Sequence, residues 1–246
     1  IGAAMVALNV PVTAHLLAIT GVVAVVIPIA SRGFLPHSRP IRTGQSSSKR
    51  ALVAWTEPRT LLIGLLILCM AFTEGTGNDW LNIAVIDGYR AAPALGTITF
   101  ALFLAAMTLG RWFGPGIIER HGRVLVLRVS AIAAIAGLLL VVFGRLLPLA
   151  MIGSGLWGLG TALGFPTGIS AASDDPGRAA ARVSVAASIG YLAFLAGPPL
   201  IGFVGDHVGV LRGLSVTLGV LAVALLASGA TAPLPTDTAR APGPEQ

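Results

Sequence analysis

Seven long apolar stretches follow one another through this chain of 246 residues. About 20 helical residues are enough to cross a hydrocarbon core of roughly 30 Å, because a helix rises about 1.5 Å per residue. The stretches cover residues 12–30, 60–86, 94–118, 124–143, 146–172, 183–205 and 208–230, and polar residues interrupt the second. We therefore expect an all-α, polytopic transmembrane helix bundle with about seven membrane-spanning helices.

The composition disfavours a soluble architecture. Hydrophobic residues make up 55% of the chain and charged residues only 11%, and the mean hydropathy is +0.87. So few polar side chains cannot cover the surface of a soluble domain of this size. A soluble two-domain enzyme is therefore the poorer interpretation.

The basic residues gather in alternate gaps between the apolar stretches. Thirteen of the sixteen Lys and Arg residues lie in or beside the first, third and fifth gaps or in the C-terminal tail, leaving Arg90, Arg145 and Arg212 elsewhere. Because cytoplasmic loops retain positive charge, residues 174–182 and the C-terminus should be cytoplasmic, in a bacterial inner membrane. Residues 87–90 and 206–212 should face outward. The same bias explains the net charge of +6 and the pI near 11.0 without a nucleic-acid partner.

The polar segments predict how the chain is organised. Residues 31–58 are the only sizeable polar connection, and we expect a flexible cytoplasmic linker there. Residues 59–232 should form a helix bundle, and the Pro- and Ala-rich residues 233–246 a disordered cytoplasmic tail. The apolar residues 1–8 look like the end of a preceding membrane helix. We therefore expect the chain to be a fragment of a larger protein.

A charged motif, GRWFGPGIIERHGR, occupies residues 110–123 after the third apolar stretch. It resembles the short cytoplasmic loops of the major facilitator superfamily, which carry a Gly, an acidic-basic pair and then Gly-Arg. The residues at the matching places are Gly114, Glu119, Arg120, Gly122 and Arg123. Glu119 stands where Asp is usual, and Pro115 stands where a polar residue is frequent. Gly122 permits a tight turn, and the charged side chains can pair with helix ends and with each other.

The last third of the chain resembles the tenth and eleventh helices of the MosC-like group in that superfamily. The matching segments are LWGLG and GFP at 156–160 and 164–166, DPGRAAAR at 175–182, GYL at 190–192 and GPPLIG at 197–202. Glu74-Gly75 and Asp79-Trp80 resemble the group's seventh helix. The resemblance implies helices six to twelve of a twelve-helix transporter. Residues 1–30 would hold the end of the fifth helix and the sixth, and residues 59–232 the seventh to twelfth.

Small residues and prolines predict helices that pack closely and bend. Glycine recurs every four residues at 160, 164 and 168, which leaves a smooth stripe for a neighbouring backbone. Proline removes a backbone donor and kinks a helix. The residues expected to serve packing or kinking are Gly160, Gly164, Pro166, Gly168, Gly197, Pro198 and Pro199. A static bundle would need the same small residues, so the pattern permits movement without requiring it.

The segment GSGLWG at 153–158 matches the GxGxxG fingerprint of dinucleotide-binding proteins. That fingerprint needs a strand before it and a helix after it. Here it lies inside an apolar stretch, so we interpret it as helix packing.

Glu74 is an acidic residue inside an apolar stretch, where an ionisable side chain is costly and therefore a functional candidate. Asn78 and Asn82 follow at i+4 and i+8 on the same helical face. This spacing predicts a polar, cavity-facing patch on the pathway of a substrate or proton, with Asp79 beside it. The alternative is that the helix ends near Glu74 and the carboxylate lies at the outer surface. We expect no metal and no cofactor, because the His and Cys residues lack metal-ligand spacing.

These observations favour a secondary transporter of a small solute, not an enzyme, working by alternating access and coupled to protons through Glu74. Its expected partners are the small-molecule substrate, protons, membrane lipid and an N-terminal half of the transporter that this chain lacks. The alternative is a truncated membrane scaffold that assembles with other proteins without transporting. A membrane enzyme ranks third, because no catalytic cluster is present in the sequence.

Overall fold

The computed structural model describes residues 11–31 and 52–234, which belong to two separate units, residues 1–44 and 45–246. In the first unit, α2 (Val12–Ser31) is an apolar helix with Pro28 inside it. The second unit is a helix bundle. Residues 32–51 of the predicted linker, residues 235–246 of the predicted tail and residues 1–8 lie outside the described residues. Residues 52–58 of the linker are described, and Pro58 begins α4.

The bundle contains eight α-helices and a 3-10 helix between residues 58 and 231, and no strand occurs in the described parts of the chain. These are α4 (Pro58–Tyr89), α5 (Pro93–His121), α6 (Arg123–Phe143), α7 (Leu147–Thr161), α8 (Gly164–Ala172), α9 (Ala179–Val208), α10 (Val210–Gly213), α11 (Val216–Ala227) and η1 (Ser228–Thr231). By length and composition six segments can cross a membrane: α4, α5, α6, α7 with α8, α9, and α10 to η1. Within α2, the apolar segment Leu16–Ser31 is shorter than these six. The expected all-α polytopic bundle is confirmed, with six such segments in the described residues where about seven were expected.

Prolines and glycines set where the helices begin and end. Pro58 and Pro93 lie in the first turns of α4 and α5, where the missing N–H has no intrahelical partner to lose. Gly122 is the single residue between α5 and α6, and Gly209 the single residue between α9 and α10. Their φ angles are 80° and 86°, which glycine adopts without steric cost. Short connections of this kind hold consecutive helices antiparallel.

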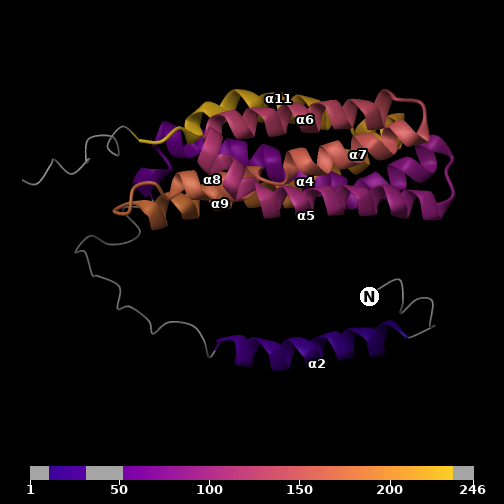
Figure 1. The fold of residues 1–246 in the computed structure, drawn as a ribbon, viewed down its shortest axis with the longest axis horizontal. Helices are drawn as coiled ribbons and strands as arrows, with labels where there is room; N and C mark the ends of the chain where they lie inside the picture. The colour runs from indigo at the N-terminus through magenta and orange to yellow at the C-terminus, as the bar shows by residue number, and fades with distance from the viewer. Residues whose placement is uncertain (1–10, 32–51, 235–246) are drawn as a thin grey trace, which may run out of the picture. The chain divides into compact units, whose positions relative to one another are not determined.

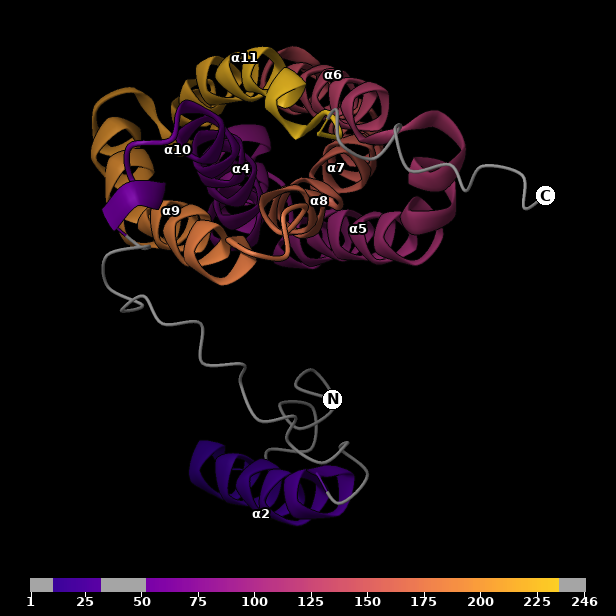
Figure 2. The ribbon, with the colours of Figure 1, turned by 90° about the vertical axis from the view of Figure 1, so that its left-hand side faces the viewer.

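α4 is the central helix of the bundle. Viewed end-on, it is enclosed by the other helices (Figure 2), and it packs against α5, α7, α8, α9, α10 and α11. Its most apolar window is 72% buried, whereas that of α9 is 22% buried. Figure 1 shows α6 and α11 along one side of the bundle and α5 along the other. A polar side chain on α4 therefore needs either a protein partner or a cavity.

Glycines let α7 approach its neighbours closely. A Cβ on Gly153 would lie 2.5 Å from the carbonyl oxygen of Gly137 in α6, and a Cβ on Gly158 would collide with the backbone of Phe103 in α5. In the predicted stripe, a Cβ on Gly160 would lie 2.5 Å from the backbone of α6, whereas Cβ atoms on Gly164 and Gly168 would collide with side chains of α4. Close packing is the main source of helix association in lipid, since burial of apolar surface gains little there.

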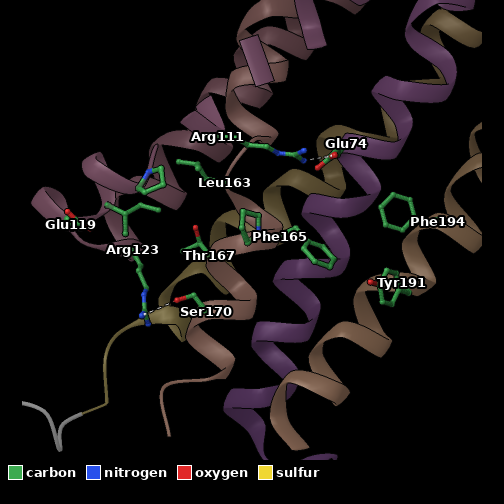
Figure 3. A pocket seen from close by; sticks show the side chains of 13 residues that line it. Glu74, Arg111, Glu119, Arg123, Leu163, Phe165, Thr167, Ser170, Tyr191 and Phe194 are labelled. Carbon is green, nitrogen blue, oxygen red and sulfur yellow. Dashed lines mark hydrogen bonds and ion pairs between the residues drawn. The ribbon is translucent and has the colours of Figure 1, made fainter. Parts of the chain in front are cut away.

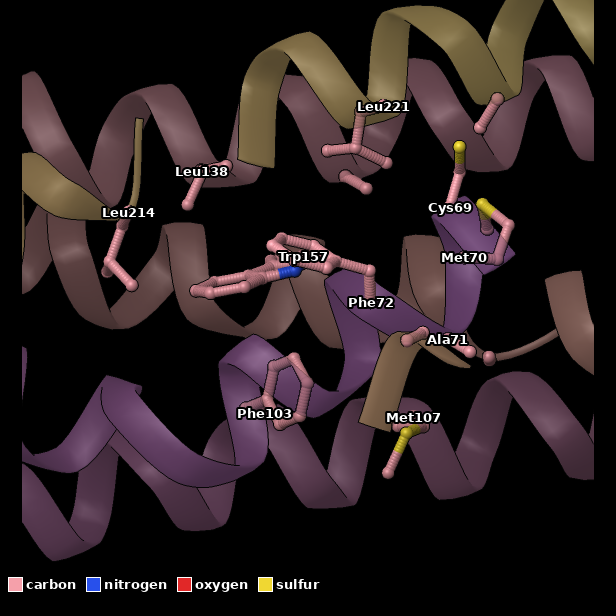
Figure 4. Packing of buried hydrophobic residues seen from close by; sticks show 14 of the residues in the cluster. Cys69, Met70, Ala71, Phe72, Phe103, Met107, Leu138, Trp157, Leu214 and Leu221 are labelled. Carbon is pink, nitrogen blue, oxygen red and sulfur yellow. The ribbon is translucent and has the colours of Figure 1, made fainter. Parts of the chain in front are cut away.

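Large side chains fill the space around these contacts. The ring of Phe103 meets the indole of Trp157 edge-on, with centroids 5.4 Å apart, and both residues are fully buried. Figure 4 shows them beside Phe72 and Leu138 from other helices. The outer surface of the bundle also carries many large apolar residues. Leu226, for example, is 84% exposed. Such a surface is suited to lipid, and the chain is a multi-pass membrane protein.

The predicted kink positions differ in their local structure. The helix of the fifth stretch breaks at residues 162 and 163, between α7 and α8, and Pro166 lies in the first turn of α8. α9 instead continues through Pro198 and Pro199. A Cβ on Gly197 would lie 3.4 Å from the ring of Phe72 in α4. The segment GSGLWG lies wholly within α7, as expected for a packing segment rather than a nucleotide site.

Replacing Gly153 should weaken the α6–α7 contact. Gly153→Ala places a Cβ against the α6 backbone, so we expect the free energy of unfolding to fall by about 1–3 kcal/mol. Gly155→Ala is the matched control, since it makes the same change in the same helix and no atom lies within 4 Å of its added Cβ. The maleimide reactivity of the buried Cys69 during heating in detergent measures unfolding. Equal losses in the two variants would contradict the packing account.

Candidate functional site

An ion pair lies near the middle of the bundle. The Nη2 atom of Arg111 in α5 donates a hydrogen bond to Oε1 of Glu74 in α4 over 2.7 Å. Glu74 lies near the middle of α4, which continues unbroken to Tyr89. The alternative that the helix ends near Glu74 is therefore wrong. The two side chains differ in access, because that of Glu74 is 15% exposed and that of Arg111 is 46% exposed.

The position of Arg111 corrects the count of loop charges. Arg111 was counted among the basic residues in or beside the third gap, but it lies about three turns before the end of α5 at His121. Without it, twelve Lys and Arg residues still lie on the predicted cytoplasmic side and three on the other. The predicted orientation is unchanged, and Arg111 lies within the membrane-capable helix α5.

The ion pair lines a cavity of about 870 Å³ that is bounded by α4, α5, α8 and α9 and the turn before α8 (Figure 3). Most of its wall is apolar. Phe165, Tyr191 and Phe194 form a connected aromatic group, with ring centroids 6.1 Å apart for the first two and 6.4 Å for the last two. Thr167 and Ser170 of α8 add hydroxyl groups. The site therefore combines one charged pair with an apolar surface, which is typical of pockets for small organic molecules.

The other residues of the predicted polar patch lie apart from this cavity. Neither Asn78 nor Asn82 lines it. The Oδ1 atom of Asn82 is buried where α4 approaches Gly96 of α5, and it has no hydrogen-bond partner in the described part of the chain. Asp79 is exposed. The structure thus brings Glu74 together with Arg111, and a role for the two asparagines and Asp79 stays a prediction.

Charged residues also gather at the end of the bundle where α4, α6 and α9 begin, which we call the basic end. Asp174, in the connection between α8 and α9, accepts hydrogen bonds from Arg59 over 2.8 Å and from Arg123 over 2.6 Å. Arg59 also donates to the carbonyl oxygen of Ala232, beyond η1. One carboxylate thereby links the starts of α4 and α6 to the end of α8.

A second cluster at the basic end is centred on Glu57, the residue before α4. Its carboxylate accepts hydrogen bonds from Arg178 over 2.9 Å and from Arg182 over 2.6 Å, and Thr60 donates a third over 3.0 Å. Burial opposes ionisation of Glu57, but the hydrogen bonds from Arg182, Thr60 and Arg178 outweigh it and hold the pKa below its ordinary value. Glu57 therefore joins the starts of α4 and α9 as a carboxylate.

Three relatives share the sequence over much of its length, although no protein-family model matches it. The chain is 33% identical over 149 residues to the uncharacterized transporter y4wD of Sinorhizobium fredii, covering 59% of this chain and 39% of that protein. It is 32% identical over 173 residues to an uncharacterized MFS-type transporter of Yersinia pestis, covering 70% and 44%. It is 26% identical over 204 residues to the membrane protein MosC of Rhizobium meliloti, covering 82% and 50%.

The resemblance to major facilitator transporters is confirmed. The chain spans half or less of the length of each of these relatives.

The residues that match the loop motif of the major facilitator superfamily lie at the end of α5 and the start of α6. Gly114 packs against Leu163, and Gly122 makes the turn. Arg123 pairs with Asp174 rather than with a neighbour in the motif. Within residues 52–234, Glu119 and Arg120 form no ion pair, although Glu119 borders the cavity. The motif therefore contributes one cation to the network of the basic end.

Sequence reasoning missed most partners in both sites. Arg111 could have been found, because it lies inside an apolar stretch and an intramembrane arginine is a functional candidate by the same rule that selected Glu74. The aromatic residues of the cavity could not be separated from lipid-facing aromatics. Arg182 is far from Glu57 in the sequence, and only the folded chain shows that they meet.

Acid should loosen the basic end through Glu57. Because its folded pKa is lowered, its ion pairs stabilise the protein above the ordinary pKa of 4.5, and this contribution is lost as the pH falls through the folded value. Glu57→Gln should therefore lower the melting temperature at neutral pH and reduce its loss on acidification. The measurement is the loss of helical circular dichroism on heating, from neutral pH to below 4.5. Glu119→Gln is the control, and a matching change in that variant would refute the role of Glu57.

Proposed function

We propose that this chain forms part of a secondary transporter of the major facilitator superfamily, which moves a small solute across a bacterial inner membrane by alternating access. The observation that carries the proposal is the Glu74–Arg111 ion pair in a cavity lined by aromatic residues. The names of the relatives support the same class.

The energetic cost of the pair supports a transport role. Charged side chains within a membrane are expensive, and they generally face a bundle interior or a water-filled cavity that serves substrates or ions. Two well-packed apolar side chains would stabilise the bundle as well as a buried ion pair does, or better. A pair retained in a cavity of about 870 Å³ is therefore better explained by binding than by folding.

We propose further that Glu74 couples transport to protons. Arg111, 2.7 Å away, compensates the charge of the Glu74 carboxylate. If Arg111 moves away or engages another group, the remaining negative charge in a partly desolvated site is costly, and Glu74 takes up a proton instead. Asn78, Asn82 and Asp79 lie further along α4, towards the end opposite the basic end, where they would extend the path of the solute or the proton.

The basic end would serve as the cytoplasmic gate. The distribution of positive charge supports the cytoplasmic side for this end, and Ala232, just after η1, lies beside Arg59 there. The Asp174 and Glu57 clusters connect the starts of α4, α6 and α9. The break between α7 and α8 gives α8 a boundary at which it can shift. We propose that another set of helices, as in relatives of about twice the length, covers the open side of the cavity.

Glu74→Gln should abolish proton-driven accumulation and leave solute exchange measurable, because the amide keeps the shape of the carboxylate but cannot carry a proton. The test uses the complete transporter in liposomes, with a substrate first found by screening labelled solutes for uptake driven by a pH gradient. Asp87→Asn, at the exposed far end of α4, is the control.

If Glu74→Gln accumulates the solute normally under a pH gradient, Glu74 does not couple transport to protons. A protein that takes up none of the screened solutes would support the alternative of a non-transporting scaffold.

A further inference from the structure

We propose that the cavity selects a small monocarboxylate with an apolar, preferably aromatic, body, and that the carboxylate of the substrate binds Arg111. This inference rests on the proposed transport function and names the substrate class of the same site.

Arg111 has donors to spare. A guanidinium group has five N–H donors arranged in a planar fork. Nη2 donates to Glu74 and Nε donates to the carbonyl oxygen of Ala162 over 3.3 Å. Within residues 52–234, Nη1 makes no hydrogen bond. The contact with Glu74 involves a single oxygen, so the two-pronged geometry that arginine offers to a carboxylate is not used up.

The difference in access decides the sign of the ligand charge. The exposed fraction of the Arg111 side chain is 46%, about three times the 15% of Glu74. A carboxylate entering the cavity therefore meets the guanidinium first. A cationic ligand would have to displace Arg111, which is also held by Ala162, to reach the more buried carboxylate. Arg123, the other cation of the cavity wall, is already occupied by Asp174.

The aromatic group predicts the rest of the ligand. Figure 3 shows Phe194 and Tyr191 on α9 facing the cavity, with Phe165 between them and the α5 side. Tyr191 is 61% exposed although it borders the cavity, so its ring is free to stack. Aromatic rings pair at centroid distances of about 4.5–7 Å and gain roughly 0.5–1.5 kcal/mol beyond the area they bury. A flat apolar body would fill this wall while its carboxylate reaches Arg111.

The test compares three probes with one shape and different charges: 3-phenylpropionate, 3-phenylpropionamide and 3-phenylpropylamine. Their binding to the purified chain is measured by calorimetry, with empty micelles subtracted. We expect the carboxylate to bind at least about tenfold more tightly than the amide and the amine, a difference of about 1.4 kcal/mol.

Variants separate the two charged residues. Arg111→Gln should remove the preference for the carboxylate, and Arg111→Lys should keep part of it. Glu74→Gln should bind the carboxylate at least as tightly as the wild type, because no competing carboxylate is left at Arg111. Cys69 reactivity on heating checks that each variant is folded.

Three outcomes would overturn the proposal. The first is that the amine binds most tightly of the three probes, and that this binding is lost in Glu74→Gln but kept in Arg111→Gln. Another is equal binding of all three probes, which would leave only an apolar cavity. The third is no carboxylate binding up to about 10 mM, weaker than any useful affinity. If the protein transports solutes but does not prefer carboxylates, the substrate class is refuted and the proposed function stands. If it binds carboxylates but transports nothing, the proposed function is refuted and the substrate class stands.

Discussion

The ion pair between Glu74 and Arg111 is the interaction on which the organisation of the site depends. A lone charge near the middle of a membrane helix costs several kcal/mol, so each of these residues requires the other. The pair couples the central helix α4 to α5 across the cavity wall. Its geometry also leaves the arginine accessible and the carboxylate recessed, and this asymmetry gives the cavity a preferred ligand charge.

The remainder of the bundle provides a rigid wall for this pair. Burial of apolar surface contributes little to helix association in lipid, so the helices are held together by close van der Waals packing. Gly137, Gly153 and Gly158 allow backbones to touch where α6, α7 and α5 cross, and Trp157 fills the adjoining space. The clusters around Asp174 and Glu57 join the helices again at the basic end. The break between α7 and α8 lies between these two regions, beside the cavity.

The sequence predicted the helices well, because the bilayer fixes their length and composition. It also predicted Gly122 as a turn residue and Glu74 as a candidate. It did not predict the partner of Glu74, since helical periodicity points to residues on the same helix, such as Asn78, whereas the actual partner is on α5. Arg111 was counted among the basic residues in or beside the third gap and was not considered as a partner for Glu74. Contacts such as Glu57 with Arg182 depend on how distant helices pack, and no local pattern carries that information.

Reversal of the charges gives the most direct test of the ion pair. Glu74→Arg and Arg111→Glu each place two like charges in the cavity, and like charges brought together cost several kcal/mol. Each single variant should therefore give little folded protein, as judged by monodispersity in detergent and by protection of Cys69 from maleimide. The double variant restores an opposite pair and should recover most of the folded yield. If both single reversals fold as well as the wild type, or if the double variant recovers nothing, the two side chains do not form the pair on which this account is built.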